Sequence, residues 1–153
     1  MRNYAVIVIG GGHAGVEAAW AAANLLPVRR GEPATVALVT ADLSKIGVMS
    51  CNPAIGGLAK GQIVREIDAM GGLMALATDA TGIQFKVLNA SKGEAVHGPR
   101  AQCDKHAYAR TVQAMIASRP EIDVIAASVE QILTREGRVR GVRVLSAAGP
   151  VEL

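Results

Sequence analysis

Three glycines near the N-terminus have a spacing that can bind a phosphate group. Gly10, Gly12 and Gly15 follow the pattern G-x-G-x-x-G within the segment YAVIVIGGGHAG. The first glycine permits a tight turn, the second lets the backbone approach a diphosphate, and the third lets a helix pack closely on a strand. The free N–H groups at the start of such a helix attract anions. The pattern predicts a dinucleotide site, with a glycine-rich turn that binds nothing as the alternative.

The residues around the motif supply the strand and the helix that it requires. Residues 4–9 are mostly β-branched and apolar, which predicts a strand buried on both faces. The alanine-rich segment after Gly15 predicts a helix, residues 27–33 predict a polar turn, and residues 35–40 predict a second buried strand. We therefore expect a β-α-β unit with parallel strands.

Dinucleotide folds usually place an acidic residue at the end of the second strand, where it binds the ribose. Here that position is Thr40, and Asp42 follows two residues later. Either Asp42 replaces the usual acid, or Thr40 binds through its hydroxyl group. Asp42 is equally suited to cap a helix, so both interpretations of this residue stay open.

The segment from Gly47 to Gly61, GVMSCNPAIGGLAKG, has neither a helical nor a strand period. Such segments are usually functional or disordered. This one lacks the polar and charged enrichment of disordered chains, which predicts an ordered loop whose backbone approaches a flat or anionic group. Cys51 in this loop is a candidate nucleophile if nearby positive charge lowers its pKa. A small side chain that fills a tight loop is the alternative.

The central residues predict short helices and strands around a basic loop. We expect a helix over 63–70, an ambiguous segment over 73–79, a half-exposed strand over 82–88, a polar loop over 89–100 and a helix over 101–118. The polar loop contains Lys92, His97 and Arg100, which suits an anionic substrate or a nucleic acid. A solvated basic turn is the alternative.

The C-terminal residues predict a third parallel strand followed by an antiparallel meander. The strand covers residues 122–126, a hairpin follows over 129–134 and 139–145, and residues 151–153 begin another strand. Several FAD-binding members of the dinucleotide fold have such a meander before a last parallel strand. Since these residues contain no such last strand, we expect them to be the N-terminal piece of a longer polypeptide.

Composition limits the classes of protein that remain. The 153 residues are enough for one domain, and with 50% hydrophobic but only 3% aromatic residues its core is aliphatic. The net charge of +3 is compatible with a polyanionic partner and with ordinary variation. No apolar run reaches the roughly 18 residues that cross a bilayer, and the two cysteines lack zinc-type spacing. We therefore expect an intracellular protein with no membrane contact and no metal.

Five segments together resemble one family of flavoproteins. They are GGGHAG (10–15), SCNPAIGGLAKG (50–61), DAMGGLMA (68–75), GIQFKVLNASKG (82–93) and GPRAQCDKHAYAR (98–110). In this fixed order they strongly resemble the glucose-inhibited division protein A family of tRNA uridine 5-carboxymethylaminomethyl modification enzymes. The resemblance extends from residue 4 to about residue 145, and members of the family are several times longer.

The resemblance implies an α/β fold, namely an FAD-binding Rossmann-like domain of the glutathione-reductase type. A parallel sheet plus an antiparallel β-meander from about residue 128 would form it, incomplete at the C-terminus. The implied activity adds a carboxymethylaminomethyl or aminomethyl group to C5 of the wobble uridine of tRNA. FAD, NADH and methylene-tetrahydrofolate are the implied cofactors. The implied partners are tRNA, a GTPase and a second copy of the full-length protein, in the cytoplasm.

The resemblance also implies roles for individual residues. The residues that would hold the FAD are Gly10, Gly11, Gly12, His13, Ala14, Gly15, Thr40, Asn52, Pro53 and Val129. Val129 would meet the adenine through its backbone, and Cys51 would lie beside the isoalloxazine. The cations Lys60, Lys92 and Arg100 would face the flavin or the tRNA. Cys103 is expected to pack within a helix, and His13 to begin one.

Other functions compete with this interpretation. A folate- and FAD-dependent tRNA uridine methyltransferase shares the glycine fingerprint, but the SCNPAIGG segment favours the first family. A stand-alone FAD-binding electron-transfer protein is disfavoured by the missing last strand. A fragment that contributes only an interaction surface is a third alternative. The isolated 153 residues are expected to be inactive, because reductant binding lies elsewhere in the family.

Overall fold

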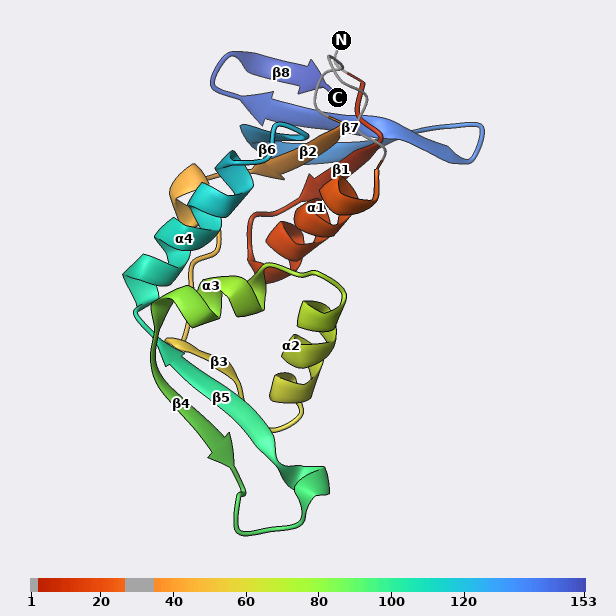
Figure 1. Ribbon diagram of the computed structural model, residues 1–153. Helices are drawn as coiled ribbons and strands as arrows, with labels where there is room; N and C mark the ends of the chain where they lie inside the picture. Colours follow the sequence, from red (N-terminus) through yellow and green to blue (C-terminus); the bar gives the residue numbers. More distant parts are fainter. Residues whose placement is uncertain (1–2, 27–34) are drawn as a thin grey trace. The chain divides into compact units, whose positions relative to one another are not determined.

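The computed structural model describes residues 3–26 and 35–153, so the turn predicted over 27–33 lies outside the described residues. The chain divides into two compact units (Figure 1). Unit 1 contains the described residues up to Ile46 and those from Ile116 to Leu153, and unit 2 contains Gly47–Met115. Each unit has its own sheet.

Unit 1 is built on a five-stranded sheet with the order β1-β2-β6-β7-β8. Its strands are β1 (Val6–Ile9), β2 (Val36–Thr40), β6 (Ile122–Arg135), β7 (Arg138–Ser146) and β8 (Gly149–Glu152). The strands β1, β2 and the first part of β6 are parallel, whereas β6, β7 and β8 form an antiparallel meander. The helix α1 (His13–Leu25) follows β1. The predicted β-α-β unit and the meander are thereby confirmed.

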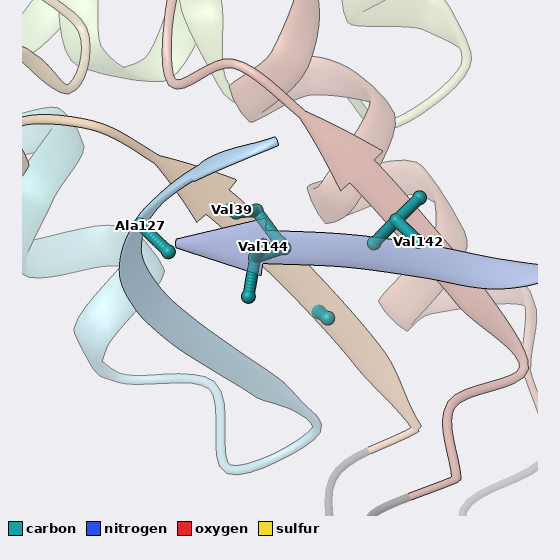
Figure 2. Packing of buried hydrophobic residues seen from close by; sticks show 5 residues of the cluster. Val39, Ala127, Val142 and Val144 are labelled. Carbon is teal, nitrogen blue, oxygen red and sulfur yellow. The ribbon is translucent and has the colours of Figure 1, made fainter. Parts of the chain in front are cut away.

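The strand β2 lies between β1 and β6, and it is buried because both of its faces are covered. Side chains alternate between the faces of a strand, and Val36, Ala37, Leu38 and Val39 are all buried. Ala37 and Val39 pack with Ala127 of β6 and with Val142 and Val144 of β7 (Figure 2). The helix α1 contacts β1 and β2 and buries Val16, Ala19 and Ala23. Each fully buried valine contributes about 1.5–3 kcal/mol to stability.

Two expectations for unit 1 were wrong in detail. The strand β1 is half-buried rather than buried on both faces, and Ile9 is 53% exposed, because β1 lies at the edge of the sheet. The segments predicted as two strands over 122–126 and 129–134 form the single strand β6. Its pairing changes from parallel with β2 to antiparallel with β7 between Ala126 and Ala127, and a register shift follows between Val129 and Gln131.

Unit 2 combines a small antiparallel sheet with helices. The sheet has the order β3-β5-β4, from β3 (Ala54–Gly56), β5 (Gly98–Cys103) and β4 (Gly82–Leu88). The helices are α2 (Lys60–Ala69), α3 (Met74–Thr81) and most of α4 (Lys105–Ala117). As predicted, α2 ends at the glycine pair: Gly71 has φ +84° and donates to the Asp68 carbonyl at 2.8 Å.

Several element assignments in unit 2 need correction. Residues 98–103, predicted as loop end and helix start, form β5. The helix α4 begins only at Lys105, because the Asp104 carboxylate accepts the N–H groups of His106 at 2.9 Å and Ala107 at 2.8 Å. Of the ambiguous segment over 73–79, Leu73 is the N-cap residue of α3 and the other residues belong to that helix. The predicted loop over 47–61 contains the strand β3.

The strand β4 has the predicted bounds, but its apolar side chains are not buried. Ile83, Phe85 and Val87 are 71%, 60% and 49% exposed, and the residues between them are exposed as well. The reason is that β4 lies at the edge of its sheet. Among the described residues, no helix has the length and apolarity needed to cross a membrane.

Candidate functional site

The turn between β1 and α1 depends on glycine at two positions. Gly10 has φ +100°, a conformation that disfavours any residue with a side chain, and it donates to the Val39 carbonyl at 2.8 Å. A Cβ atom on Gly15 would overlap the carbonyl oxygen of Gly10. The close approach of helix to strand therefore requires glycine at residue 15, as the motif predicts.

The N-terminal end of α1 is open. Gly12 is the N-cap residue, no side chain caps the helix, and the first turn contains no acidic residue. A Cβ atom built on Gly12 would have no other atom within 4 Å. Backbone N–H groups at such a helix end, together with the positive end of the helix dipole, bind anions. The residues therefore fit a diphosphate group.

The end of β2 lies beside this turn. A Cβ atom on Gly11 would come within 2.9 Å of Ile46 Cγ1 and 3.3 Å of Thr40 Oγ1. Asp42 caps a short 3-10 helix, η1 (Leu43–Lys45), and its carboxylate accepts the N–H of Ser44 at 2.8 Å and the hydroxyl of Ser44 at 2.7 Å. These hydrogen bonds lower the pKa of Asp42. The capping interpretation of Asp42 is confirmed, and Thr40 is the residue beside the glycine turn.

His13 is the first residue of α1, as expected, and it is half-buried. Burial lowers the pKa of His13 below its usual value, and the nearby Glu17 opposes this shift. The neutral imidazole is therefore the form that the fold favours, and a helix N-terminus also disfavours a cation.

A pH titration of stability tests this state of His13. With its pKa lower in the folded chain than in the unfolded chain, His13 favours folding above the unfolded pKa of about 6.5. That contribution is lost as the pH falls through the folded pKa. We expect the free energy of unfolding, measured with urea between pH 7.5 and pH 5, to fall more steeply for the wild type than for His13→Gln. Parallel curves would contradict the assignment. The other two histidines are common to both proteins.

The glycine-rich loop of unit 2 packs against β5. Gly57 donates to the Pro99 carbonyl at 2.8 Å, and a Cβ atom on Gly56 or Gly61 would overlap the same carbonyl oxygen. Pro53 accepts from the N–H of Cys103 at 2.7 Å, and the Asn52 carbonyl accepts from Ala54 at 2.8 Å. Gly56 and Gly61 thus permit a close approach to the chain's own backbone. The predicted approach of this loop to a flat or anionic group stays a prediction.

The two cysteines have different surroundings. Cys51 is exposed, and its Sγ lies 3.9 Å from the hydroxyl oxygen of Ser50. Cys103 is buried in β5, not in a helix as expected. Burial raises the pKa of the Cys103 thiol, and the hydroxyl groups of Thr81 and Thr78 oppose the shift. A buried protonated thiol reacts slowly, so we expect the exposed thiol of Cys51 to react faster than that of Cys103.

Thiol labelling tests this difference. In the folded chain we expect a colorimetric disulfide reagent to modify one thiol per chain quickly, and to modify the second only after denaturant is added. Cys51→Ser should remove the fast phase, and Cys103→Ser should leave it unchanged. Equal rates for both thiols in the folded chain would contradict the burial of Cys103.

The three cations singled out in the sequence lie on different elements of unit 2. Lys60 is the exposed first residue of α2, and Lys92 lies in the turn after β4, where its carbonyl is 3.0 Å from His97 Nε2. Arg100 is half-buried in β5, not in a loop, and Lys86 of β4 lies directly opposite it. Lys86 was not singled out because its strand partner β5 was not predicted. Val129 lies in β6, where it packs against the core of unit 1.

Comparisons with known proteins agree with this arrangement. The model of a family described as glucose inhibited division protein A matches residues 5–149. A tRNA uridine 5-carboxymethylaminomethyl modification enzyme from Chlorobium chlorochromatii is 53% identical over 144 residues, which are 94% of this chain and 22% of that protein. This chain thus spans about a fifth of the length of such curated relatives.

Solved structures are similar as well. A crystal form of GidA from Aquifex aeolicus has a TM-score of 0.87 and 47% identity, with 99% of this chain and 24% of that chain covered. A glycerol-3-phosphate dehydrogenase from Bacillus halodurans, solved in complex with FAD, has a TM-score of 0.59 at 16% identity, with 99% and 32% covered. At that identity the second similarity concerns the fold alone.

Proposed function

Because this chain belongs to the glucose-inhibited division protein A family, we propose that it is the FAD-binding part of a flavoenzyme that modifies tRNA. The reaction attaches a carboxymethylaminomethyl or aminomethyl group to C5 of the wobble uridine. The complete enzyme uses NADH and methylene-tetrahydrofolate, works with a partner GTPase as a homodimer, and acts in the cytoplasm. The observation that carries the proposal is the glycine turn before the uncapped N-terminus of α1.

In this proposal the chain's own residues bind and position the cofactor. The N–H groups at residues 12–15 hold the diphosphate, while Gly10 and Gly15 keep the strand and helix close enough to present them. Thr40 lies beside the turn and contacts the ribose, and the backbone of Val129 contacts the adenine. Asn52 and Pro53 lie near the isoalloxazine ring. When bound, FAD supplies the redox chemistry, and the protein supplies placement and electrostatics.

We further propose that Cys51 is the nucleophile that attacks a carbon of the uracil ring or of the flavin adduct. Its support is the exposed thiol within a glycine-rich loop, in contrast to the buried Cys103. Lys60, Lys92 and Arg100 neutralise phosphates of the flavin or of the tRNA.

A chimera tests the function as a whole. The 153 residues would replace the matching segment of GidA from Aquifex aeolicus, with which they share 47% identity. In a bacterial strain that lacks its own enzyme, we expect the chimera to purify with FAD and to restore the modified wobble uridine, measured by mass spectrometry of digested tRNA. A folded, flavin-containing chimera that leaves the uridine unmodified would contradict the proposal.

The same chimera tests Cys51. If the thiol is the nucleophile, Cys51→Ala lowers the modification rate by more than about a hundredfold and leaves the FAD content unchanged. Cys103→Ala is the matched control and is expected to retain the rate. Full activity of Cys51→Ala would instead assign the residue to filling a tight loop.

A further inference from the structure

One face of the sheet of unit 2 carries a regular grid of polar and small residues. In the strand register, Arg100 of β5 lies between Gly56 of β3 and Lys86 of β4. Two residues along β5, Gln102 lies between Ala54 and Gln84. Residues opposite one another, and alternate residues of one strand, share a face. Gln84, Lys86, Arg100 and Gln102 therefore form one surface, the polar sheet face.

The other face of the same sheet has a different character. There Ala101 of β5 lies opposite Ile55 of β3 and Phe85 of β4, so its central row is apolar. Ala101 and Ile55 are buried. The core of unit 2 thus uses this apolar face, and the polar sheet face does not contribute to it.

The four side chains of the polar sheet face are available to a ligand. Within residues 3–26 and 35–153, no hydrogen bond or ion pair joins any of them to another residue. Gln84 and Lys86 are exposed, and Arg100 and Gln102 are half-buried. Like charges directly opposite one another destabilise a sheet, and no acidic residue occupies the six positions of the grid. An anion between Lys86 and Arg100 would relieve this repulsion.

The neighbouring row suits a nucleobase. Two residues of an antiparallel strand span about 7 Å. The amide groups of Gln84 and Gln102 therefore lie about as far from Lys86 and Arg100 as the base of a nucleotide lies from its phosphate. Each glutamine amide has two N–H donors and one carbonyl acceptor, so it can form hydrogen bonds with the polar edge of a base. Ala54, which lies opposite Gln102, has only a methyl group as its side chain, and this leaves room at that side for a planar ring.

We propose that the polar sheet face binds one nucleotide of a single-stranded RNA segment. Lys86 and Arg100 bind its phosphate, and Gln84 and Gln102 hydrogen-bond the edge of its base. Sequence-specific recognition of RNA is directed to unpaired bases, whose edges are accessible. This inference rests on the proposed function in tRNA modification, and it assigns part of the RNA contact to residues of unit 2.

Fluorescence anisotropy of the 153-residue chain with a labelled RNA stem–loop tests the proposed roles of Lys86 and Arg100. The RNA carries unpaired uridines in its loop. We expect Lys86→Gln and Arg100→Gln each to weaken binding about tenfold, as for a lost hydrogen bond to a charged group. Each should also reduce the slope of log K against log salt by about 0.7. Arg110→Gln removes an exposed cation of α4 with the same change in net charge, and it should bind as the wild type does. Lys86→Arg should retain affinity.

The preference for one base over another tests the proposed roles of Gln84 and Gln102. Gln84→Ala combined with Gln102→Ala is expected to reduce the preference for a uridine loop over an adenosine loop at least about fivefold, with an unchanged salt slope. If Lys86→Gln and Arg100→Gln bind the RNA as Arg110→Gln does, the inference is overturned. It is also overturned if the wild type binds heparin as tightly as it binds the RNA stem–loop. The proposed function is judged independently by FAD binding at the glycine turn: RNA binding at this face without FAD binding at the turn would contradict that proposal alone.

Discussion

Gly15→Ala is expected to lower the free energy of unfolding by about 3 kcal/mol, the upper part of the usual range for overpacking. The added Cβ would overlap the carbonyl oxygen of Gly10. Backbone cannot rotate away as a flexible side chain does, so α1 would have to move off β1. The burial of Val16, Ala19 and Ala23 on that side of the sheet would then be reduced.

Urea unfolding, followed by the fluorescence of the chain's single tryptophan, measures this loss. Trp20 lies in α1, and the Arg119 guanidinium carbon lies 4.8 Å from its ring centroid, so its emission reports on the position of this helix. Gly93→Ala is the matched control, since a Cβ at Gly93 meets nothing within 4 Å and its φ is −60°. Equal stability of the two variants would show that the close approach at Gly15 is not required.

Gly12→Asp is expected to weaken FAD binding about a hundredfold without loss of stability. An aspartate is a preferred N-cap residue, and it should leave the free energy of unfolding unchanged or raise it by a few tenths of a kcal/mol. The same carboxylate would project into the open space before α1, where the diphosphate binds. Like charges placed together cost several kcal/mol in an interface, which corresponds to the expected loss of affinity.

Equilibrium dialysis of the chimera against FAD, paired with urea unfolding of the 153-residue chain, separates the two effects of this substitution. Gly12→Ala is the control for size, because it adds a side chain without charge at a φ of −71° that alanine adopts freely. We expect it to bind FAD with an affinity between those of the wild type and Gly12→Asp. Undiminished FAD binding by Gly12→Asp would place the diphosphate elsewhere.

Local sequence signals were sufficient for the elements around the glycine turn. The strand β2, the helix α1 and the hairpin of β6 and β7 each have a clear apolar pattern or a turn signal in a short segment, as at Glu136 and Gly137, which both have positive φ. The fixed order of the five motifs carried the resemblance to a family, and that resemblance implied the FAD-binding fold. Burial was less predictable, because both β1 and β4 lie at the edge of a sheet: the apolar run of β1 is only half-buried, and the apolar side chains of β4 are exposed.

The strand β5 could not be predicted in the same way. Its sequence, GPRAQC, alternates apolar residues with Arg100 and Gln102, but it begins with glycine and proline and contains no β-branched or aromatic residue, so it was assigned to a loop and a helix. Its β4 partners begin at Leu88, which pairs with Gly98 across a long turn, and its β3 partners at residues 54–56 lie farther away still, so this pairing is not encoded locally. Without β5, the juxtaposition of Lys86 with Arg100 was hidden. The capping position of Asp104 was the one local signal for the true start of α4.

Amide NMR spectra of the ¹⁵N-labelled chain test the central claim most directly, namely that backbone N–H groups at the start of α1 bind the FAD diphosphate. Affinity is expected to be weak, because this chain spans only about a fifth of the length of its curated relatives, so FAD would be added in large excess. We predict that the largest shifts occur at the amides of Gly12, His13, Ala14 and Gly15. Shifts centred on another segment, or unchanged signals at these four amides, would contradict the account.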